Sequence, residues 1–205
     1  MLFSDAYFTL EGPSESVFRD RGSRFLGYAY PVKNEEDIKQ HLAHLHQEHA
    51  QAIHWCYAWR LGADKLRFRA NDDGEPTGSA GKPILGQIQS HDLTNVLIVV
   101  VRYFGGTLLG VPGLINAYKV AAAEAIGAGK IIEQFIQYEY RINYDADDTS
   151  AVMRLLRELQ AKIIENSYDE RHYTRFHIKK KFVESLDEKS RELYKTKLEL
   201  LAELA

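Results

Sequence analysis

Residues 95–101 read Asn95-Val96-Leu97-Ile98-Val99-Val100-Val101. Every residue after Asn95 is apolar, and most are β-branched. An unbroken run of this kind is typical of a central strand that is covered on both faces of its sheet. Helices are expected on either side along the chain, at 35–49 and at 112–128. The first part of the chain is therefore predicted to combine helices with a sheet, as in an α/β or α+β domain.

The composition of the sequence changes near residue 135. All 14 glycines lie at or before Gly129, and the residues that follow predict strand, helix, strand, strand and helix. A capping-box pattern at 185–188 is expected to open the last of these helices. We therefore predict two α+β domains, residues 1–135 and residues 136–205.

The composition is that of a folded globular protein. Of its 205 residues, 45% are hydrophobic, and the single cysteine, Cys56, excludes an internal disulfide and a thiol-based zinc site. No apolar run approaches the ~20 residues of a membrane span, and residues 1–5 lack the pattern of a leader, so a cytoplasmic location is expected. Because the net charge is −3, nucleic acid would have to bind at a local basic patch.

Two segments carry the densest set of chemically active residues. Residues 71–83 read NDDGEPTGSAGKP, and residues 102–118 read RYFGGTLLGVPGLINAY. Because the two segments flank elements of the same sheet, they are expected to meet, with Arg102 within ion-pair reach of one of the acidic residues. The candidate binding residues are Asp72, Asp73, Glu75, Arg102, Tyr103, Gly105, Gly106, Gly110 and Gly113.

Each set has two interpretations. The three carboxylates fit general acid–base work or hard-cation binding, but they equally fit a turn that caps a helix and pairs with an arginine. The glycines at 105–113 feed into a helix N-terminus, which suits an anion, but they also suit a loop that only needs tight turns. No serine or cysteine has a persuasive base beside it, so no catalytic residue is assigned.

The two segments resemble the signature boxes of the YigZ/IMPACT family, DDGEP-x-GTAG-x-P and RYFGG-x-x-LG-x-GGL-x-x-AY. The resemblance implies a first domain similar to the second domain of a small-subunit ribosomal protein, and a ferredoxin-like second domain similar to the last domain of the translocation elongation factor. Eukaryotic members regulate translation by competing for the activator of an amino-acid-starvation kinase. They carry a different extra domain that is not visible here, so this mechanism is not transferred. Leu108 and Asn116 stand where the family usually has basic residues, which weakens a phosphate-binding interpretation of the second box.

A predicted hairpin offers a second basis for function. If residues 53–60 and 65–70 pair so that opposing numbers sum to 125, one face buries Trp55, Tyr57 and Trp59, and the other is basic without an acid. Residues 173–182 show the same alternation. The expected nucleic-acid-binding residues are Arg60, Lys65, Arg67, Arg69, Arg175, Lys179 and Lys181. The alternative is that both are ordinary solvated sheet faces.

Histidines concentrate in one part of the chain, at His41, His44, His46, His49 and His54. Helical spacing distributes them over several faces, so neither a metal site nor a cofactor is predicted. His49 continues an apolar stripe and is expected to be packed and hydrogen-bonded.

The sequence therefore predicts a cytosolic accessory protein that binds RNA, a ribosomal surface or a translation factor. Two alternatives stay open. One is a small hydrolase or transferase in which Asp73 or Glu75 acts as the base and Arg102 clamps an anion. The other is a protein-binding adaptor. The sequence does not predict the oligomeric state.

Overall fold

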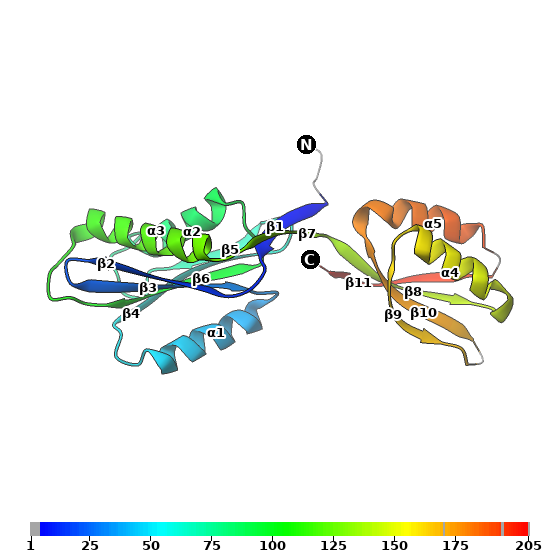
Figure 1. The fold of residues 1–205 in the computed structure, drawn as a ribbon, viewed down its shortest axis with the longest axis horizontal. Helices are drawn as coiled ribbons and strands as arrows, with labels where there is room; N and C mark the ends of the chain where they lie inside the picture. Colours follow the sequence, from blue (N-terminus) through cyan, green and yellow to red (C-terminus); the bar gives the residue numbers. More distant parts are fainter. Residues whose placement is uncertain (1–4, 170, 194, 205) are drawn as a thin grey trace. The chain divides into compact units, whose positions relative to one another are not determined.

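The computed structural model describes residues 5–169, 171–193 and 195–204, and the chain forms two compact units (Figure 1). The first unit is Tyr7–Gln134, and the second joins Phe135–Ala205 to Met1–Ala6. Both units combine helices with antiparallel sheets, so the predicted mixture of helices and strands is confirmed. The domain bounds 1–135 and 136–205 stay a prediction, because compactness alone does not show that each part folds by itself.

The first unit is built on a five-stranded antiparallel sheet with the order β2-β3-β6-β4-β5. Its strands are β2 (Ser14–Asp20), β3 (Ser23–Pro31), β4 (His54–Leu61), β5 (Arg67–Asn71) and β6 (Val96–Tyr103). Its helices are α1 (Glu35–Glu48), α2 (Gly81–Ser90) and α3 (Gly110–Ala128). A separate two-stranded sheet is formed by β1 (Ala6–Leu10) and β7 (Ile131–Phe135).

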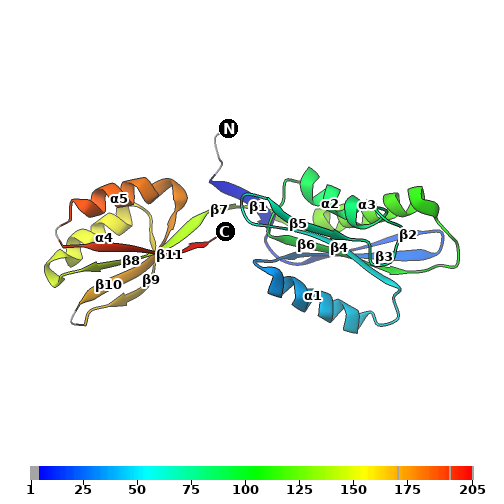
Figure 2. The same cartoon turned by 180° about the vertical axis from the view of Figure 1, so that it is seen from behind.

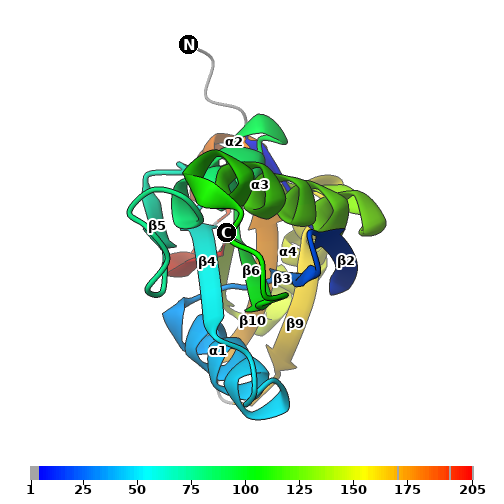
Figure 3. The ribbon, with the colours of Figure 1, turned by 90° about the vertical axis from the view of Figure 1, so that its left-hand side faces the viewer.

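The middle strand β6 confirms the prediction drawn from its apolar run. The even-numbered side chains of 96–101 lie in the core that α2 and α3 form with the sheet, and the odd-numbered ones lie in the core under α1. All of them are fully buried. Figure 3 shows α2 and α3 on one face of the sheet and α1 on the other. A strand covered in this way needs an apolar residue at every position.

The hairpin of β4 and β5 differs from the predicted register. Trp59 lies opposite Arg69 rather than Leu66, so each partner comes three residues later than expected. Such an odd shift moves every side chain of β5 to the other face of the sheet. Arg67 and Arg69 therefore share a face with Trp59, on the side of α1. Arg60 lies on the opposite face.

The cause of this register is the connection between the two strands, residues 62–66. Gly62 N donates to Asn95 Oδ1 at 2.8 Å, and Thr94 Oγ1 donates to the Gly62 carbonyl at 2.7 Å. Both partners precede β6 and are distant in sequence. They hold a longer connection in place where the sequence suggested a tight turn.

The second unit has a four-stranded antiparallel sheet with the order β11-β8-β10-β9 (Figure 2). Its strands are β8 (Gln137–Tyr144), β9 (Lys162–Ser167), β10 (His172–Lys179) and β11 (Lys197–Leu204). Its helices are α4 (Thr149–Glu158) and α5 (Val183–Arg191), with short 3₁₀ turns η1 (Ala146–Asp148) and η2 (Lys180–Phe182). The predicted strand, helix, strand, strand and helix are confirmed, whereas β11 is an additional strand. The resulting β-α-β-β-α-β order is that of ferredoxin-like domains.

Both helices of the second unit cover the same face of its sheet. The core between them includes Ile142, Leu156, Phe176 and Leu186. Side chains that alternate with the buried ones on β8 and β10 point to the opposite face, over which no described helix packs (Figure 1). We call this surface the open face, and its residues on the two central strands are Gln137, Glu139, Arg141, Asn143, Tyr173, Arg175, His177 and Lys179.

Candidate functional site

The two sequence boxes meet in the first unit at a buried ion pair. Glu75 Oε1 accepts hydrogen bonds from Arg102 Nη1 at 2.5 Å and from the Tyr118 hydroxyl at 2.7 Å. The side chains of Glu75 and Arg102 are only 4% and 6% exposed. The predicted ion pair is therefore confirmed, and Tyr118, the last residue of the second box, is a further partner of the carboxylate.

Asp72 caps the start of α2. Its carboxylate accepts hydrogen bonds from the backbone N–H groups of Gly78, Ala80 and Gly81 at 2.8, 3.0 and 2.8 Å. Burial acts to raise the pKa of Asp72, but these N–H groups outweigh it and hold the pKa below its usual value. Asp72 is thus an ionised structural group.

Asp73 links the turn after β5 to β4 by hydrogen bonds. Its Oδ2 accepts a hydrogen bond from Trp55 N at 2.7 Å, and its carbonyl accepts one from His54 Nδ1 at 2.7 Å. The other ring nitrogen of His54 lies 3.8 Å from Glu75 Oε1. All three candidate carboxylates therefore have structural partners.

The buried groups beside Glu75 are not activated for chemistry. Cys56 Sγ donates to the Asp72 carbonyl at 3.0 Å, and burial raises the pKa of Cys56 well above its ordinary value. Burial also raises the pKa of Tyr118. A thiol and a phenol that stay protonated are poor nucleophiles. The geometry therefore favours the structural interpretation of the first box.

The glycine-rich loop is shaped by close packing and by tight turns. A Cβ atom at Gly105 would lie 1.9 Å from the carbonyl carbon of Gly22, so two backbones touch here. Gly105 N donates to Ser23 Oγ at 3.1 Å. Gly106 and Gly110 have φ angles of +86° and +71°, where a side chain would be strained. These contacts account for the glycines without a ligand, and the anion-binding interpretation stays a prediction.

Two further candidates of the second box also have packing partners. A Cβ atom at Gly113 would lie 3.0 Å from Leu109 Cβ. The Tyr103 hydroxyl is 3.0 Å from His49 Nδ1, and His49 Nε2 is 2.7 Å from the Tyr28 hydroxyl. The prediction that His49 is packed and hydrogen-bonded is confirmed.

Neither a metal centre nor a membrane span is found in the part of the chain that the structure describes. No three or more His, Cys, Asp or Glu side chains lie close enough there to hold a metal ion. His41 and His46 instead pack on Tyr30 and Trp55, with ring centres 4.0 and 4.2 Å apart. No described helix is both long and apolar enough to cross a membrane.

The predicted basic face of the first unit is wrong, first because Arg60 is buried. Its Nε donates to the Leu93 carbonyl at 2.5 Å, and its Nη2 lies 3.7 Å from Asp92 Oδ1. Burial lowers the pKa of Arg60. Arg60 lies on the face of the sheet that α2 and α3 cover, as do its β4 neighbours Cys56 and Ala58, and the changed register of β5 places Arg67 and Arg69 on the other face.

The remaining cations of that hairpin are also not free of acids. Lys65 Nζ lies 2.6 Å from Asp92 Oδ1, and Arg67 Nη2 lies 2.8 Å from Glu35 Oε1. Both carboxylates come from parts of the chain outside the hairpin, so the hairpin sequence alone did not reveal them. Arg69 is exposed. Of the four cations predicted for the hairpin, it is the one that is neither buried nor in an ion pair among the described residues.

In the second unit, the predicted alternation is confirmed along β10. Arg175, His177 and Lys179 lie on the open face, and Phe176 is buried on the helix side. Lys181 is an exception, because the strand ends at Lys179 and Lys181 belongs to η2. The prediction that Lys181 continues the strand face is therefore wrong.

The open face carries acids as well as cations. Arg175 bridges Glu139 and Glu165, with N–O distances of 2.5 and 2.8 Å. Lys179 Nζ lies 4.2 Å from the centre of the Phe135 ring. Arg175 is therefore partly neutralised, whereas Lys179 contacts an aromatic ring.

Sequence reasoning missed a charged pocket at one end of this sheet. The pocket has a volume of about 510 Å³, and its charged lining residues are Arg141, Asp145, Arg171, Lys195, Lys197 and Glu199. Arg141 also lies on the open face, where its guanidinium carbon is 3.9 Å from the centre of the Tyr173 ring. The alternation of Arg141 with Tyr140 and Ile142 was the one available signal, because it places Arg141 on the uncovered side of β8.

The fold and the site together define a class of two-domain proteins. The first unit contains a buried Glu–Arg–Tyr cluster, and the second has the element order β-α-β-β-α-β. The Impact N-terminal domain family matches residues 21–126. An "IMPACT family member" of Haemophilus influenzae is 34% identical over 179 residues, 84% of this chain and 85% of that protein. "IMPACT family member YigZ" of Escherichia coli is 33% identical over 158 residues, 76% of this chain and 78% of that protein. The chain therefore belongs to the IMPACT family.

A solved structure has the same fold along nearly the whole chain. It is described as a crystal structure of a hypothetical protein, with a TM-score of 0.72 and 30% identity. The match covers 96% of this chain and 97% of that one. The predicted family resemblance is thus confirmed by both sequence and fold.

Proposed function

We propose that this chain is a translation-associated RNA-binding protein that uses the open face of its second unit. The observation that carries the proposal is the stacking of Arg141 on Tyr173 on the two central strands, 3.9 Å from guanidinium carbon to ring centre. A basic group beside an aromatic ring on an uncovered sheet is suited to a backbone phosphate and a stacked base at the same time.

Other cations of the open face extend this surface. Lys162 on β9 is exposed and lies opposite His177, and Lys179 follows on the same face of β10. Arg175 is held between two glutamates, so its role in the proposal is to keep the central strands in place. Of the two predicted candidates, Arg175 therefore has a structural role, and Lys179 is proposed to contact the RNA.

The architecture supports the same class of partner. Four-stranded sheets with an open aromatic face are the platform on which RNA-recognition domains bind single strands. The likeness of the second unit to the last domain of the translocation elongation factor, and of the first unit to a ribosomal protein domain, belongs to this proposal and rests on the family resemblance. Such an analogy indicates a class of partner and no particular RNA sequence.

The link to translation comes from the family. Its eukaryotic members are expected to be translational regulators, and we extend to this chain only the association with the translation machinery. The hydrolase or transferase alternative has less support, because Glu75 is buried between two donors and Asp73 is occupied by Trp55 N. A protein-binding adaptor is the alternative that an absence of RNA binding would favour.

Fluorescence anisotropy with a labelled single-stranded RNA of about 12 nucleotides tests the proposal. We expect Lys162→Glu/Lys179→Glu to weaken binding and to reduce the log–log salt slope by about 1.4, because each phosphate contact contributes about 0.7. The matched control is Arg154→Glu/Arg157→Glu, two exposed cations of α4 on the helix-covered side. Equal losses for the two variants, or no binding by the unchanged protein, would refute the proposal.

A further inference from the structure

The charged pocket lies on the β8–β11 side of the open face, because Lys197 and Glu199 lie opposite Asn143 and Arg141. Its lining residues come from three parts of the chain, namely β8 with the residue after it, the β9–β10 connection, and β11 with the segment before it. We infer that this pocket is a binding site for a phosphate group. The inference deepens the proposed function, and it rests on that function only where RNA supplies the phosphate.

The balance of charge in the pocket favours an anion. Among the residues that the structure describes, four cationic side chains and two carboxylates line it, although the whole chain has a net charge of −3. The two carboxylates are already paired with lysines, since Lys195 lies 3.7 Å from Asp145 and Lys197 lies 2.8 Å from Glu199. Because the lysines are paired in this way, the arginines are the groups that can bind an additional anion.

Arg141 and Arg171 are the cations best placed to do so. Among the described residues, neither forms an ion pair with a carboxylate, while both line the pocket. Arg141 is held in position, because its Nε donates to Asn143 Oδ1 at 3.1 Å and its guanidinium lies on the Tyr173 ring. A fixed guanidinium offers two parallel N–H donors, which match the oxygens of a phosphate.

The size and lining of the pocket disfavour apolar ligands and metal ions. Its volume of about 510 Å³ lies within the ~300–1,000 Å³ typical of small-ligand sites. A lining of charged side chains does not suit an apolar ligand, because desolvating these groups without partners is costly. The excess of cations disfavours a metal ion. A phosphate, either from the RNA backbone or from a small phosphorylated molecule, fits a pocket of this size and pairs with its excess of cations.

Isothermal titration calorimetry of the full chain with inorganic pyrophosphate tests the inference. We expect Arg171→Gln to weaken pyrophosphate binding about tenfold or more, the loss typical of one charge-assisted hydrogen bond. Arg171 is exposed in a connection, so this change is expected to leave the fold intact. The control, Arg154→Gln, removes an exposed cation of α4 and should bind pyrophosphate as the unchanged protein does.

The RNA titration of the same variants distinguishes the two sources of phosphate. If Arg171→Gln weakens RNA binding as well, the pocket holds a backbone or terminal phosphate of RNA. If RNA binding is unaffected or absent while pyrophosphate binding depends on Arg171, the ligand is a small phosphorylated molecule, and the inference stands even without the proposed function. Failure of the unchanged protein to bind pyrophosphate at millimolar concentration, or equal effects of Arg171→Gln and Arg154→Gln, would overturn the inference.

Discussion

The Glu75 carboxylate is buried, and its Oε1 accepts hydrogen bonds from two donors. A charge in such a place stays buried only because Arg102 and Tyr118 satisfy it. The network joins β6 and α3 to the turn after β5, which explains how the two sequence boxes meet although about 30 residues separate their starts. The network holds the two boxes together in the folded first unit.

Removing the charge of Glu75 is expected to destabilise the first unit strongly. Glu75→Gln leaves the Arg102 guanidinium buried without a counter-charge, which typically costs about 3–5 kcal/mol. Urea unfolding of the full chain measures this loss in the free energy of unfolding. The double variant Glu75→Leu/Arg102→Met should cost less than the sum of its two single changes. A loss below about 0.5 kcal/mol for Glu75→Gln would show that the ion pair is not buried as described.

Gly105 provides a second test at the level of one residue. Gly105→Ala places a methyl group 1.9 Å from the Gly22 backbone, so the turn between β2 and β3 and the loop after β6 must separate, and we expect a loss of several kcal/mol in the free energy of unfolding. Gly127→Ala is the matched control, because Gly127 lies in α3 and nothing stands within 4 Å of the added atom. That change should stabilise the protein by about 0.5–1 kcal/mol. Equal effects of the two changes in thermal unfolding would contradict the described packing.

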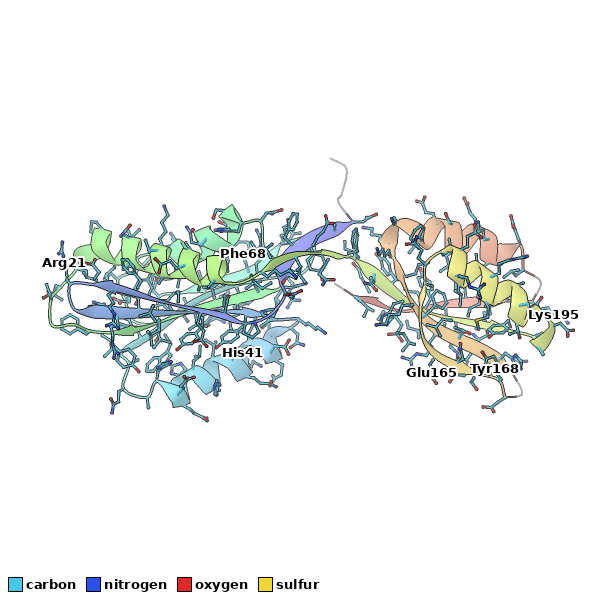
Figure 4. All side chains as sticks on the ribbon, in the orientation of Figure 1. Arg21, His41, Phe68, Glu165, Tyr168 and Lys195 are labelled. Carbon is cyan, nitrogen blue, oxygen red and sulfur yellow. The ribbon has the colours of Figure 1, made fainter. Side chains whose placement is uncertain are left out.

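His41 gives the first unit a pH dependence. Its ring packs on Tyr30 between α1 and the sheet (Figure 4), and burial lowers the pKa of His41, with Asp37 opposing the shift. Because the folded state prefers the neutral ring, this contribution to stability is present above the unfolded pKa of about 6.5 and is lost as pH falls through the lower folded pKa. His41→Phe should therefore lose part of the decline in unfolding free energy between about pH 7 and 5. An unchanged pH profile would contradict this account.

The strands that were predicted well are those whose faces are fixed by burial. β6, β8 and β10 show the apolar pattern that their surroundings require, so alternation or an unbroken apolar run was enough to orient them. β5 was misplaced because contacts from Asn95 and Thr94, distant in sequence, set its pairing. β11 was missed because its Leu, Glu and Ala residues are good helix formers, and tertiary pairing with β8 overrides that preference.

The start of α5 was also misplaced for a local reason. The capping-box pattern at 185–188 predicts an N-terminus there, but the helix begins at Val183 and follows the 3₁₀ turn η2 directly. A chain that is already helical at its N-terminal side does not need the side-chain cap. The same turn removes Lys181 from the face of β10.

The register of β4 and β5 predicts opposite behaviour for two aromatic residues. Phe68, which is labelled in Figure 4, is 54% exposed, whereas Trp59 packs in the core under α1. Phe68→Ser should change the free energy of unfolding by less than about 1 kcal/mol, and Trp59→Ala should cost about 3–5 kcal/mol. The register expected from sequence would bury both side chains on one face. Comparable losses for the two variants in urea unfolding would therefore restore that register.

The molecule as a whole combines a first unit stabilised by a buried polar cluster with a second unit that exposes a charged sheet. The family and the meeting of its two boxes could be predicted from sequence, because those residues lie in continuous motifs. The charged pocket could not, because its cations come from separated segments that only the sheet order brings together. Figure 4 labels one of them, Lys195, in the connection between α5 and β11.

The most direct test of the central claim is chemical-shift mapping of the ¹⁵N-labelled full chain during titration with the single-stranded RNA. We expect the largest shifts on the backbone amides of β8 and β10, including Arg141, Tyr173 and Lys179, because those strands carry the open face. Amides of α4 and α5 should move little, since the helices cover the other side of the sheet. Shifts confined to the helices or to the first unit, with β8 and β10 unmoved at saturating RNA, would contradict the assignment of the open face as the RNA-binding surface.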